Sequence, residues 1–342
     1  MDLALSPEDE ELVAALAALL AEESSADRVR AAEGLGFDPA LWEALQRLGV
    51  PGLALGPEAA SAGQLVLIAE QAGRRLACAP VVETLVTARL LERCGGPVAE
   101  ALAARCEAGA ITTLVLHPLD GAEAELVPAG AVADTVLAFD GEVITAVAAD
   151  PPMAASSNVG GLPLADLDLA AGSAETVAEG ERARSAFEAA RRDWQLLTAA
   201  QLVGLAARSL ELGVEYVRER RVFDRPVGSF QTVAHKLADH ATAVDGARLL
   251  VREAAWAVDG HDPRAFALTT MAFCFAAERA LAVAGDSLHF HGGYGFTLEY
   301  DIQLYYRRAQ AYPLVWGSVR REYQRLADQL FGETASGRGE AA

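Results

Sequence analysis

Aromatic residues are scarce in this chain, at 6% of the sequence, although hydrophobic residues make up 52% of it. The core must therefore be built mainly from Ala, Leu and Val. Ala and Leu are strong helix formers, and Ala-rich stretches recur along the chain, so we expect a mainly helical protein. The 342 residues are enough for two or three domains, each with its own core.

Basic residues are also few. The chain has 28 Lys and Arg against 48 Asp and Glu, which gives a formal net charge of −20. A negative field of this size argues against nucleic acid or an anionic membrane surface as the main partner. An anionic ligand would have to be met by local arginines.

The four cysteines form no Cys-x-x-Cys pair and no other metal spacing, so buried, reduced thiols are the simplest interpretation. The N-terminus lacks the basic and apolar regions of a signal peptide. No apolar run reaches the ~20 residues that a membrane helix needs. We therefore predict a cytoplasmic protein without a metal site or a membrane segment.

Three patterns follow one another along the chain. The first is helical: Ser6 can cap a helix with Pro7 in its first turn and Asp9 at the capping-box position, and further helical spacings continue to about residue 108. The second consists of short β-branched runs, with a hairpin turn signal at Asp140-Gly141. Its predicted strands cover 111–116, 125–128, 135–139, 142–147 and 162–169.

The third pattern is helical again and continues to residue 331. Four long helices joined by short connections are typical of an antiparallel bundle. The helices are predicted at 186–221, 231–259, 263–284 and 314–330. The fold class is therefore mainly α with a small β-domain. We predict an N-terminal helical domain (1–108), a middle, shortened, β-barrel-like domain (109–176), a C-terminal four-helix bundle (177–331) and a disordered tail (332–342).

The first distinctive segment begins at Arg220 and reads Arg-Arg-Val-Phe-Asp-Arg-Pro-Val-Gly-Ser-Phe-Gln. A helix is expected to end there in a turn rich in guanidinium groups, with Phe223 nearby and a new helix starting at Gln231. Guanidinium groups and free helix N-terminal N–H groups are what a pyrophosphate needs. Taken alone, a basic turn between helices is usually only a solvated corner.

The second segment, residues 289–296, reads His-Phe-His-Gly-Gly-Tyr-Gly-Phe. Its glycines allow positive φ angles or a close approach of a ligand to the backbone. His289 and His291 have the spacing of two metal ligands, but no Asp, Glu or Cys at a recognisable spacing completes a site. We therefore predict no metal there.

In this order, the two segments resemble the acyl-CoA dehydrogenase family, whose C-terminal domain carries an R-x-x-F-G-x-x-x-x-x-F-Q turn and later an H-G-G-x-G-F loop. Segments 234–239 and 299–309 also match, and weaker matches reach the N-terminal part of the chain. The resemblance implies FAD between the bundle and the β-domain, with the adenine half reaching a neighbouring subunit.

By position, Arg220 and Phe223 would meet the FAD pyrophosphate and adenine, and Gln231 would cap the next helix near the cofactor. From across the dimer interface, the same half of the cofactor would be lined by His289, Gly292 and Gly293.

The implied reaction is α,β-dehydrogenation of an acyl-CoA: a carboxylate removes the α-proton while the β-hydrogen leaves as hydride to the flavin. The base must be a buried Glu or Asp with a pKa raised toward neutrality. The two family positions for this base align here with Trp316 and Arg221, and neither side chain can accept a proton. No catalytic residue is therefore assigned; weak candidates for a replacement are Glu219, Glu299 and Asp301.

The β-domain departs from the family pattern as well. Members carry a T/S-E-P-x-x-G-S-D loop and a W-I-T-N strand that hold the isoalloxazine ring. Here residues 116–121 read Leu-His-Pro-Leu-Asp-Gly, and no Trp lies between Trp42 and Trp194. The sequence keeps the adenine half of the site and departs from the family in the flavin-ring half.

Three hypotheses remain open. The chain is the FAD-site-sharing subunit of a heterotetramer, as in bacterial steroid side-chain degradation, with a longer homologue supplying the catalytic Glu. Alternatively, it is a stand-alone homo-oligomeric acyl-CoA dehydrogenase with a relocated base. The third hypothesis is a non-catalytic scaffold that has lost the cofactor. The first two hypotheses describe enzymes, and each of these would need an electron-transfer acceptor.

Overall fold

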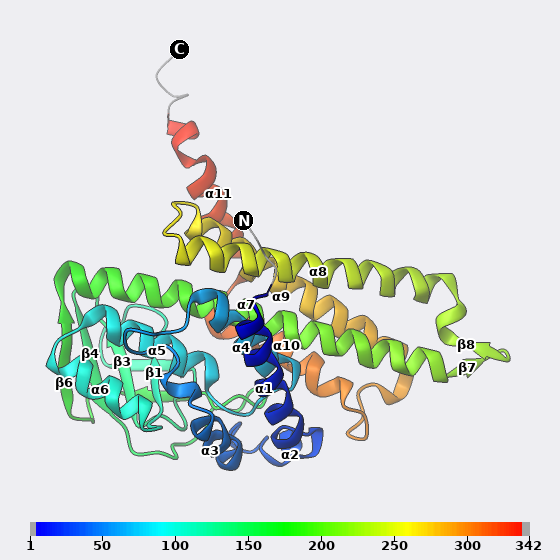
Figure 1. The fold of residues 1–342 in the computed structure, drawn as a ribbon, viewed down its shortest axis with the longest axis horizontal. Helices are drawn as coiled ribbons and strands as arrows, with labels where there is room; N and C mark the ends of the chain where they lie inside the picture. Colours follow the sequence, from blue (N-terminus) through cyan, green and yellow to red (C-terminus); the bar gives the residue numbers. More distant parts are fainter. Residues whose placement is uncertain (1–4, 337–342) are drawn as a thin grey trace.

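The computed structural model describes residues 5–336, and the order helices, strands, helices is as predicted (Figure 1). Seven N-terminal elements come first: α1 (Pro7–Glu23), α2 (Ala26–Ala31), α3 (Pro39–Arg47), the 3₁₀ turn η1 (Val50–Gly52), α4 (Ala62–Arg74), α5 (Val81–Cys94) and α6 (Pro97–Glu107). The predicted capping box is confirmed, because Ser6 Oγ accepts the Asp9 N–H and the Asp9 carboxylate accepts the Ser6 N–H.

The middle segment forms two small sheets rather than one. Its strands are β1 (Thr112–Leu114), β2 (Glu123–Val127), β3 (Thr135–Phe139), β4 (Val143–Ala148), β5 (Ala165–Asp168) and β6 (Ala174–Glu179). The larger sheet has the order β1-β3-β4-β6, with β1 parallel to β3 and the other pairs antiparallel, while β2 pairs with β5. The strands of residues 5–336 do not close into a barrel.

The predicted hairpin between β3 and β4 is confirmed. Asp140 Oδ1 accepts the backbone N–H groups of Glu142 and Val143, and Gly141 has a φ of +104°. Strand β6 was not predicted. It is the edge strand of the larger sheet, and its first three residues are exposed, so its sequence lacks the apolar alternation of a half-buried strand.

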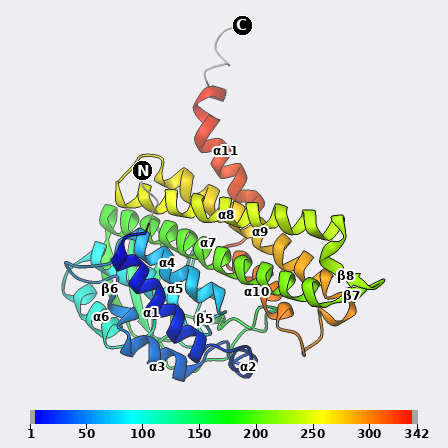
Figure 2. The same ribbon diagram turned by 45° about the vertical axis from the view of Figure 1, so that its right-hand side comes forward.

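Five helices make up the C-terminal segment: α7 (Gly180–Glu219), α8 (Gln231–Asp259), α9 (Ala265–Phe290), α10 (Ile302–Trp316) and α11 (Val319–Ser336). The predicted helix at 314–330 is wrong in its boundaries, because the chain breaks at Gly317, where φ is +120°, and α10 was missed. Helix α11 projects from the bundle in both views (Figure 1 and Figure 2) and continues to Ser336. The remainder of the predicted tail lies outside the described residues.

Helices α4 and α7 hold the N-terminal helices against the bundle through contact between their backbones. A Cβ added at Gly73 would lie 1.8 Å from the Gln201 carbonyl oxygen, and one added at Gly204 would lie 1.8 Å from the Glu70 carbonyl oxygen. Only glycine permits so close an approach, because any side chain would overlap the opposing helix. The two glycines therefore fix the position of α4 along α7.

Helix α9 is long and apolar enough to cross a membrane by length and composition alone. It packs against α7, α8, α10 and α11, and most of it is buried. This is the position of a core helix. The four cysteines are buried and unpaired, as expected.

Candidate functional site

The arginine-rich segment forms a hairpin at the end of α7 opposite the β-strands (Figure 1). It comprises β7 (Arg221–Val222), β8 (Arg225–Pro226) and the 3₁₀ turn η2 (Val227–Ser229). Phe223 and Asp224 form its tip with φ values of +52° and +61°, and the Phe223 ring is 86% exposed. Arg220, the residue that follows α7, is exposed as well. The hairpin thus presents an unpacked aromatic ring near the exposed Arg220, while Arg221 donates to the Asp224 carbonyl oxygen and Arg225 stacks on Phe230.

The glycine-rich segment follows α9, and its two histidines diverge. His289 is exposed, whereas His291 is buried with its Nδ1 2.7 Å from the Ser287 carbonyl oxygen. Burial lowers the pKa of His291. Gly292 then takes a φ of +64°, and it is exposed together with Gly293. One histidine is therefore structural and only the other is available to a ligand.

A stacked ring pair brings the two segments to the same end of the bundle. The Tyr216 ring, one turn before the end of α7, lies 4.0 Å from the His291 ring at an interplanar angle of 24°. Arg220 follows Tyr216 by one helical turn, and His289 precedes His291 by two residues. The exposed residues predicted to contact the adenine half of FAD are thus held at one end of the molecule.

Gln231 has a different role from the one expected. It is the first residue of α8 and is exposed, and the N-cap position belongs to Phe230, with no side-chain capping hydrogen bond. A side chain caps a helix from the position before its first turn, and Gln231 is already inside the helix. The prediction that Gln231 caps α8 is wrong.

At the other end of the site, Trp316 closes α10 and is 5% exposed. Its indole stacks on that of Trp194, with centroids 5.7 Å apart and an interplanar angle of 16°. The Arg191 guanidinium lies 4.8 Å from the centre of the Trp316 ring, and Phe273 meets the ring edge-on at 6.2 Å. Trp194, Arg191 and Phe273 thus pack on the indole, and none of these three side chains can remove a proton from a substrate. The His117 ring also lies against the indole, with centroids 5.5 Å apart.

His117 connects this cluster to residues 116–121, the segment that the sequence aligns with the flavin-ring loop of the family. Its Nε2 lies 2.9 Å from the Trp316 carbonyl oxygen, so this nitrogen carries the proton and donates it. Burial lowers the pKa of His117, which favours the neutral ring. The 116–121 segment thus supports the end of α10.

Arg221 lies far from Trp316, in the exposed hairpin. Helix α7 rises about 1.5 Å per residue, so its course from Trp194 to Glu219 spans roughly 38 Å. Arg221 therefore shares no site with Trp316, and its assignment as the second base position is wrong. The α7 side chain that meets Trp316 is Trp194.

None of the three suggested replacement residues has the properties of a catalytic base. Glu299 is exposed, and a hydrogen bond from the Thr297 side chain lowers the pKa of its carboxyl. Asp301 Oδ1 is 2.6 Å from Arg30 Nη2, at the opposite end of α10 from Trp316. Glu219 is exposed at the end of α7.

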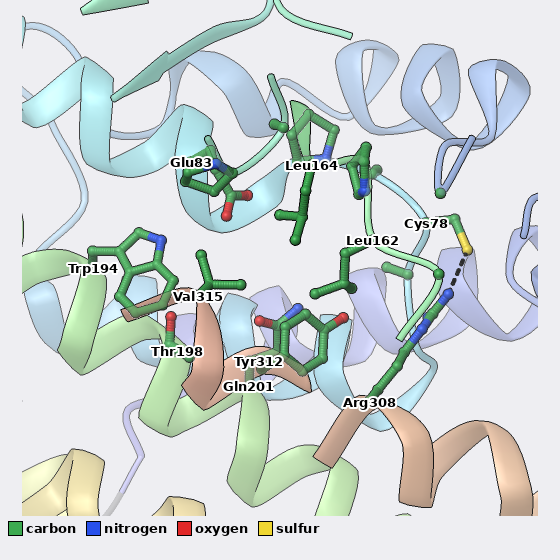
Figure 3. Close-up of a pocket in the computed structure, with 18 residues that line it drawn as sticks. Cys78, Glu83, Leu162, Leu164, Trp194, Thr198, Gln201, Arg308, Tyr312 and Val315 are labelled. Atoms are coloured by element: carbon green, nitrogen blue, oxygen red, sulfur yellow. Dashed lines mark hydrogen bonds between the residues drawn. The ribbon is translucent and has the colours of Figure 1, made fainter. Parts of the chain in front are cut away.

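A pocket that the sequence did not predict lies beside the tryptophan pair (Figure 3). Glu83 of α5 points its carboxyl into the pocket, and burial there raises the pKa of that carboxyl. Trp194, Thr198 and Gln201 of α7 line one wall. One signal was available in the sequence: Glu83 is a single carboxylate within the apolar run Val-Val-Glu-Thr-Leu-Val.

A family model described as "Acyl-CoA dehydrogenase, C-terminal domain" matches residues 181–331. Acyl-CoA dehydrogenase IpdE2 of Mycolicibacterium smegmatis is 31% identical over 96% of this chain and 100% of its own length. IpdE2 of Mycobacterium tuberculosis is 28% identical over 95% and 98% of the two chains.

Solved structures match along almost the whole chain. A chain of the "Tcur3481-Tcur3483 steroid ACAD G363A variant" superposes with a TM-score of 0.85 at 24% identity, covering 96% of this chain and 99% of that one. A chain of the ChsE4-ChsE5 complex from Mycobacterium tuberculosis gives 0.82 at 25%, with the same coverage. The fold, the two motifs and the IpdE2 relatives agree: the chain belongs to the acyl-CoA dehydrogenase family, whose members are flavoproteins that oxidise CH–CH bonds.

Proposed function

We propose that this chain is the FAD-site-sharing subunit of a heteromeric acyl-CoA dehydrogenase whose partner supplies the catalytic Glu. The observation that carries the proposal is the burial of Trp316, which by sequence aligns with the family's base position and is packed by Trp194 and Arg191. The ChsE4-ChsE5 complex, which consists of two different subunits, has a chain of this fold.

The exposed end of the bundle fits the charged half of FAD. Arg220 would neutralise the pyrophosphate, because its guanidinium is free to form charge-assisted hydrogen bonds. Phe223 would pack on the adenine with its exposed ring. Gly292 and Gly293 have no atoms within 4 Å of an added Cβ, so a ligand can approach their backbone closely. His289 would add a ring donor to the same half of the cofactor.

The flavin-ring half does not fit this chain's own residues. The tryptophan pair fills the space where a proton acceptor would face the substrate, and His117 ties the replaced loop to α10. FAD, when bound, accepts the β-hydrogen as hydride. In our proposal this chain binds and orients the adenine half, and its Trp316 cluster excludes water and substrate from its own copy of the site.

The substrate class that we propose is a steroid-derived acyl-CoA, since one chain of the same fold is that of a steroid ACAD. The assembly would be a heterotetramer in the cytoplasm, which passes its electrons to a separate acceptor. The pocket beside Trp194 leaves a second candidate function, a stand-alone dehydrogenase. Of the carboxylates considered, only Glu83 combines burial with the raised pKa that such a base needs.

Flavin content decides between these functions. The chain is purified alone and also after co-expression with a longer acyl-CoA dehydrogenase homologue that carries the family's Glu. The proposal expects a colourless chain alone and a yellow complex that an acyl-CoA reduces anaerobically. One FAD per protomer and flavin reduction by the chain alone would favour the stand-alone enzyme, and a colourless complex would favour the scaffold.

A further inference from the structure

A small cavity lies where the N-terminal helices meet the bundle. Its walls come from the turn between α1 and α2, the end of α4, the middle of α7 and the first turn of α10, and its empty volume, counted with its opening, is about 400 Å³. It shares no lining residue with the pocket beside Trp194. Arg208, which lines it, precedes Arg220 by a length of α7 that spans roughly 18 Å at 1.5 Å per residue. The cavity is therefore separate from the proposed FAD contacts.

Two guanidinium groups line this cavity. Arg75, which follows α4, is partly buried, and its side chain forms no hydrogen bond or ion pair with any residue from 5 to 336. Arg208 uses its Nη1 for Glu211 and Glu215, at 3.0 and 2.9 Å, while its Nε and Nη2 donate to no described residue. Burial raises the pKa of Tyr305, and the positive charges of Arg208 and Arg75 oppose that rise, so both guanidiniums lie near this phenol. Unused N–H donors of two cations thus meet in one cavity.

The rest of the lining leaves this positive charge uncompensated. Ser25 Oγ accepts the Arg28 backbone N–H, so the hydroxyl hydrogen of Ser25 is free to donate to a ligand. Asp301 is the only carboxylate among the described residues that line the cavity, and its Oδ1 already lies 2.6 Å from Arg30 Nη2. The cavity therefore has an excess of positive charge, in a chain whose formal net charge is −20.

These groups fit a small oxyanion better than other ligands. Two guanidiniums would repel a cation. A hydrocarbon would remove the polar groups of the wall from water without giving them partners. A carboxylate offers two acceptor oxygens, whereas a phosphate or sulfate offers more, arranged tetrahedrally, and can accept from two guanidiniums and a hydroxyl together.

We propose that this cavity binds a phosphate or sulfate group, held by Arg75 and Arg208 with the Ser25 hydroxyl as a third donor. The bound group neutralises the free charge of Arg75. It also joins the turn between α1 and α2 to α4 and α7, so its binding stabilises the packing of the N-terminal helices on the bundle. The site does not depend on the proposed function.

Calorimetric titration and thermal unfolding test the proposal on the full chain, either alone or in the complex with which it is purified. Sodium phosphate, sodium sulfate and glycerol 3-phosphate are compared with sodium chloride at the same ionic strength. We expect saturable binding and a concentration-dependent rise in Tm for the oxyanions, and neither for chloride. Tighter binding of inorganic phosphate would identify a free ion as the ligand, and tighter binding of the ester would identify the phosphate group of a larger molecule. The proposal is overturned if no oxyanion binds saturably, or if chloride raises the Tm equally.

Variants then assign the binding to this cavity. Arg75→Gln removes one charged donor and should weaken phosphate binding about tenfold. Its Tm in chloride should match that of the parent, because the Arg75 side chain has no partner in the fold. Arg75→Lys keeps the charge and should retain more of the affinity than Arg75→Gln. Arg220→Gln, at the proposed FAD pyrophosphate site, should bind phosphate like the parent. Undiminished binding to Arg75→Gln, or a loss of binding with Arg220→Gln alone, would contradict the assignment.

Discussion

The indoles of Trp194 and Trp316 stack with their centroids 5.7 Å apart, and this pair joins the middle of α7 to the end of α10. Arg191 covers the Trp316 ring from 4.8 Å, one helical turn before Trp194. In our proposal, a dehydrogenase with its own base would have a carboxylate at this point. Here the space is part of the hydrophobic core, so the Trp316 side chain serves stability.

Truncation of Trp316 should therefore destabilise the chain. Trp316→Ala removes a buried aromatic ring and leaves a cavity, so the free energy of unfolding should fall by about 3–5 kcal/mol. Urea unfolding followed by circular dichroism measures the change. Leu314→Ala is the matched control: it lies on the same helix but is 57% exposed, and it should cost no more than about 0.5 kcal/mol. Equal effects of the two substitutions would contradict the burial of Trp316.

The arginine hairpin should control how tightly the complex binds FAD. Arg220→Gln removes one charged hydrogen-bond donor to the pyrophosphate, and we expect about tenfold weaker FAD binding in the co-expressed complex. Fluorescence titration of the deflavinated complex with FAD gives the Kd. Arg320→Gln, an equally exposed arginine on α11, should leave the Kd unchanged. If both variants bind FAD like the parent, the hairpin is not the pyrophosphate site.

The backbone contact between α4 and α7 predicts opposite effects for two Gly-to-Ala substitutions. Gly204→Ala places a methyl group 1.8 Å from the Glu70 carbonyl oxygen and should cost about 3 kcal/mol or more. Gly246→Ala in α8 meets only Phe275, at 3.9 Å, and should be neutral or stabilise the fold by up to about 1 kcal/mol. Thermal unfolding of the two variants measures whether each substitution lowers or raises the stability of the fold. A Gly204→Ala protein as stable as the parent would exclude the tight helix contact.

Alkaline stability should depend on two buried thiols. Burial raises the pKa of Cys94 to about 11 and that of Cys274 to about 12, from an unperturbed value of 9.0. The folded state therefore retains protons that the unfolded state releases. The contribution of the two protonated thiols to stability is complete below pH 9 and is lost as the pH rises through their pKa values in the folded state. Urea midpoints of the parent should fall between pH 9 and 10.5. A Cys94→Ala, Cys274→Ala protein should show a smaller fall over this range, and an identical fall would refute the assignment.

Much of the fold could be predicted from local sequence patterns. The capping box at Ser6 and the turn at Asp140 satisfy backbone groups within a few residues, so their patterns are sufficient. Helix α10 was missed, and its Arg308 depends on partners that a local pattern does not show. In the structure Arg308 is 3% exposed and donates to carbonyl groups of Leu76 and Gly160, which are distant in sequence. Only the tertiary fold supplies those partners.

In the candidate site, too, some residues could be predicted from local sequence and others could not. The proposed adenine-side motifs could be recognised because their residues are close together in sequence. Trp194 and Glu83 could not, since their meaning depends on contacts between α5, α7 and α10 that no local pattern records. Arg221 was misassigned for the same reason. How far it lies from Trp316 depends on where α7 ends, and the local sequence does not show this.

The most direct test of the central claim identifies the chain that carries the base. Anaerobic single-turnover reduction of FAD by an acyl-CoA is measured in three complexes: the parent complex, one in which the partner's catalytic Glu is replaced by Gln, and one with Glu83→Gln in this chain. Our account predicts that the partner substitution slows flavin reduction by at least about a hundredfold, while Glu83→Gln leaves it within a few-fold of the parent. Our account would be contradicted if Glu83→Gln greatly slowed flavin reduction while the complex without the partner's Glu reduced its flavin at the normal rate.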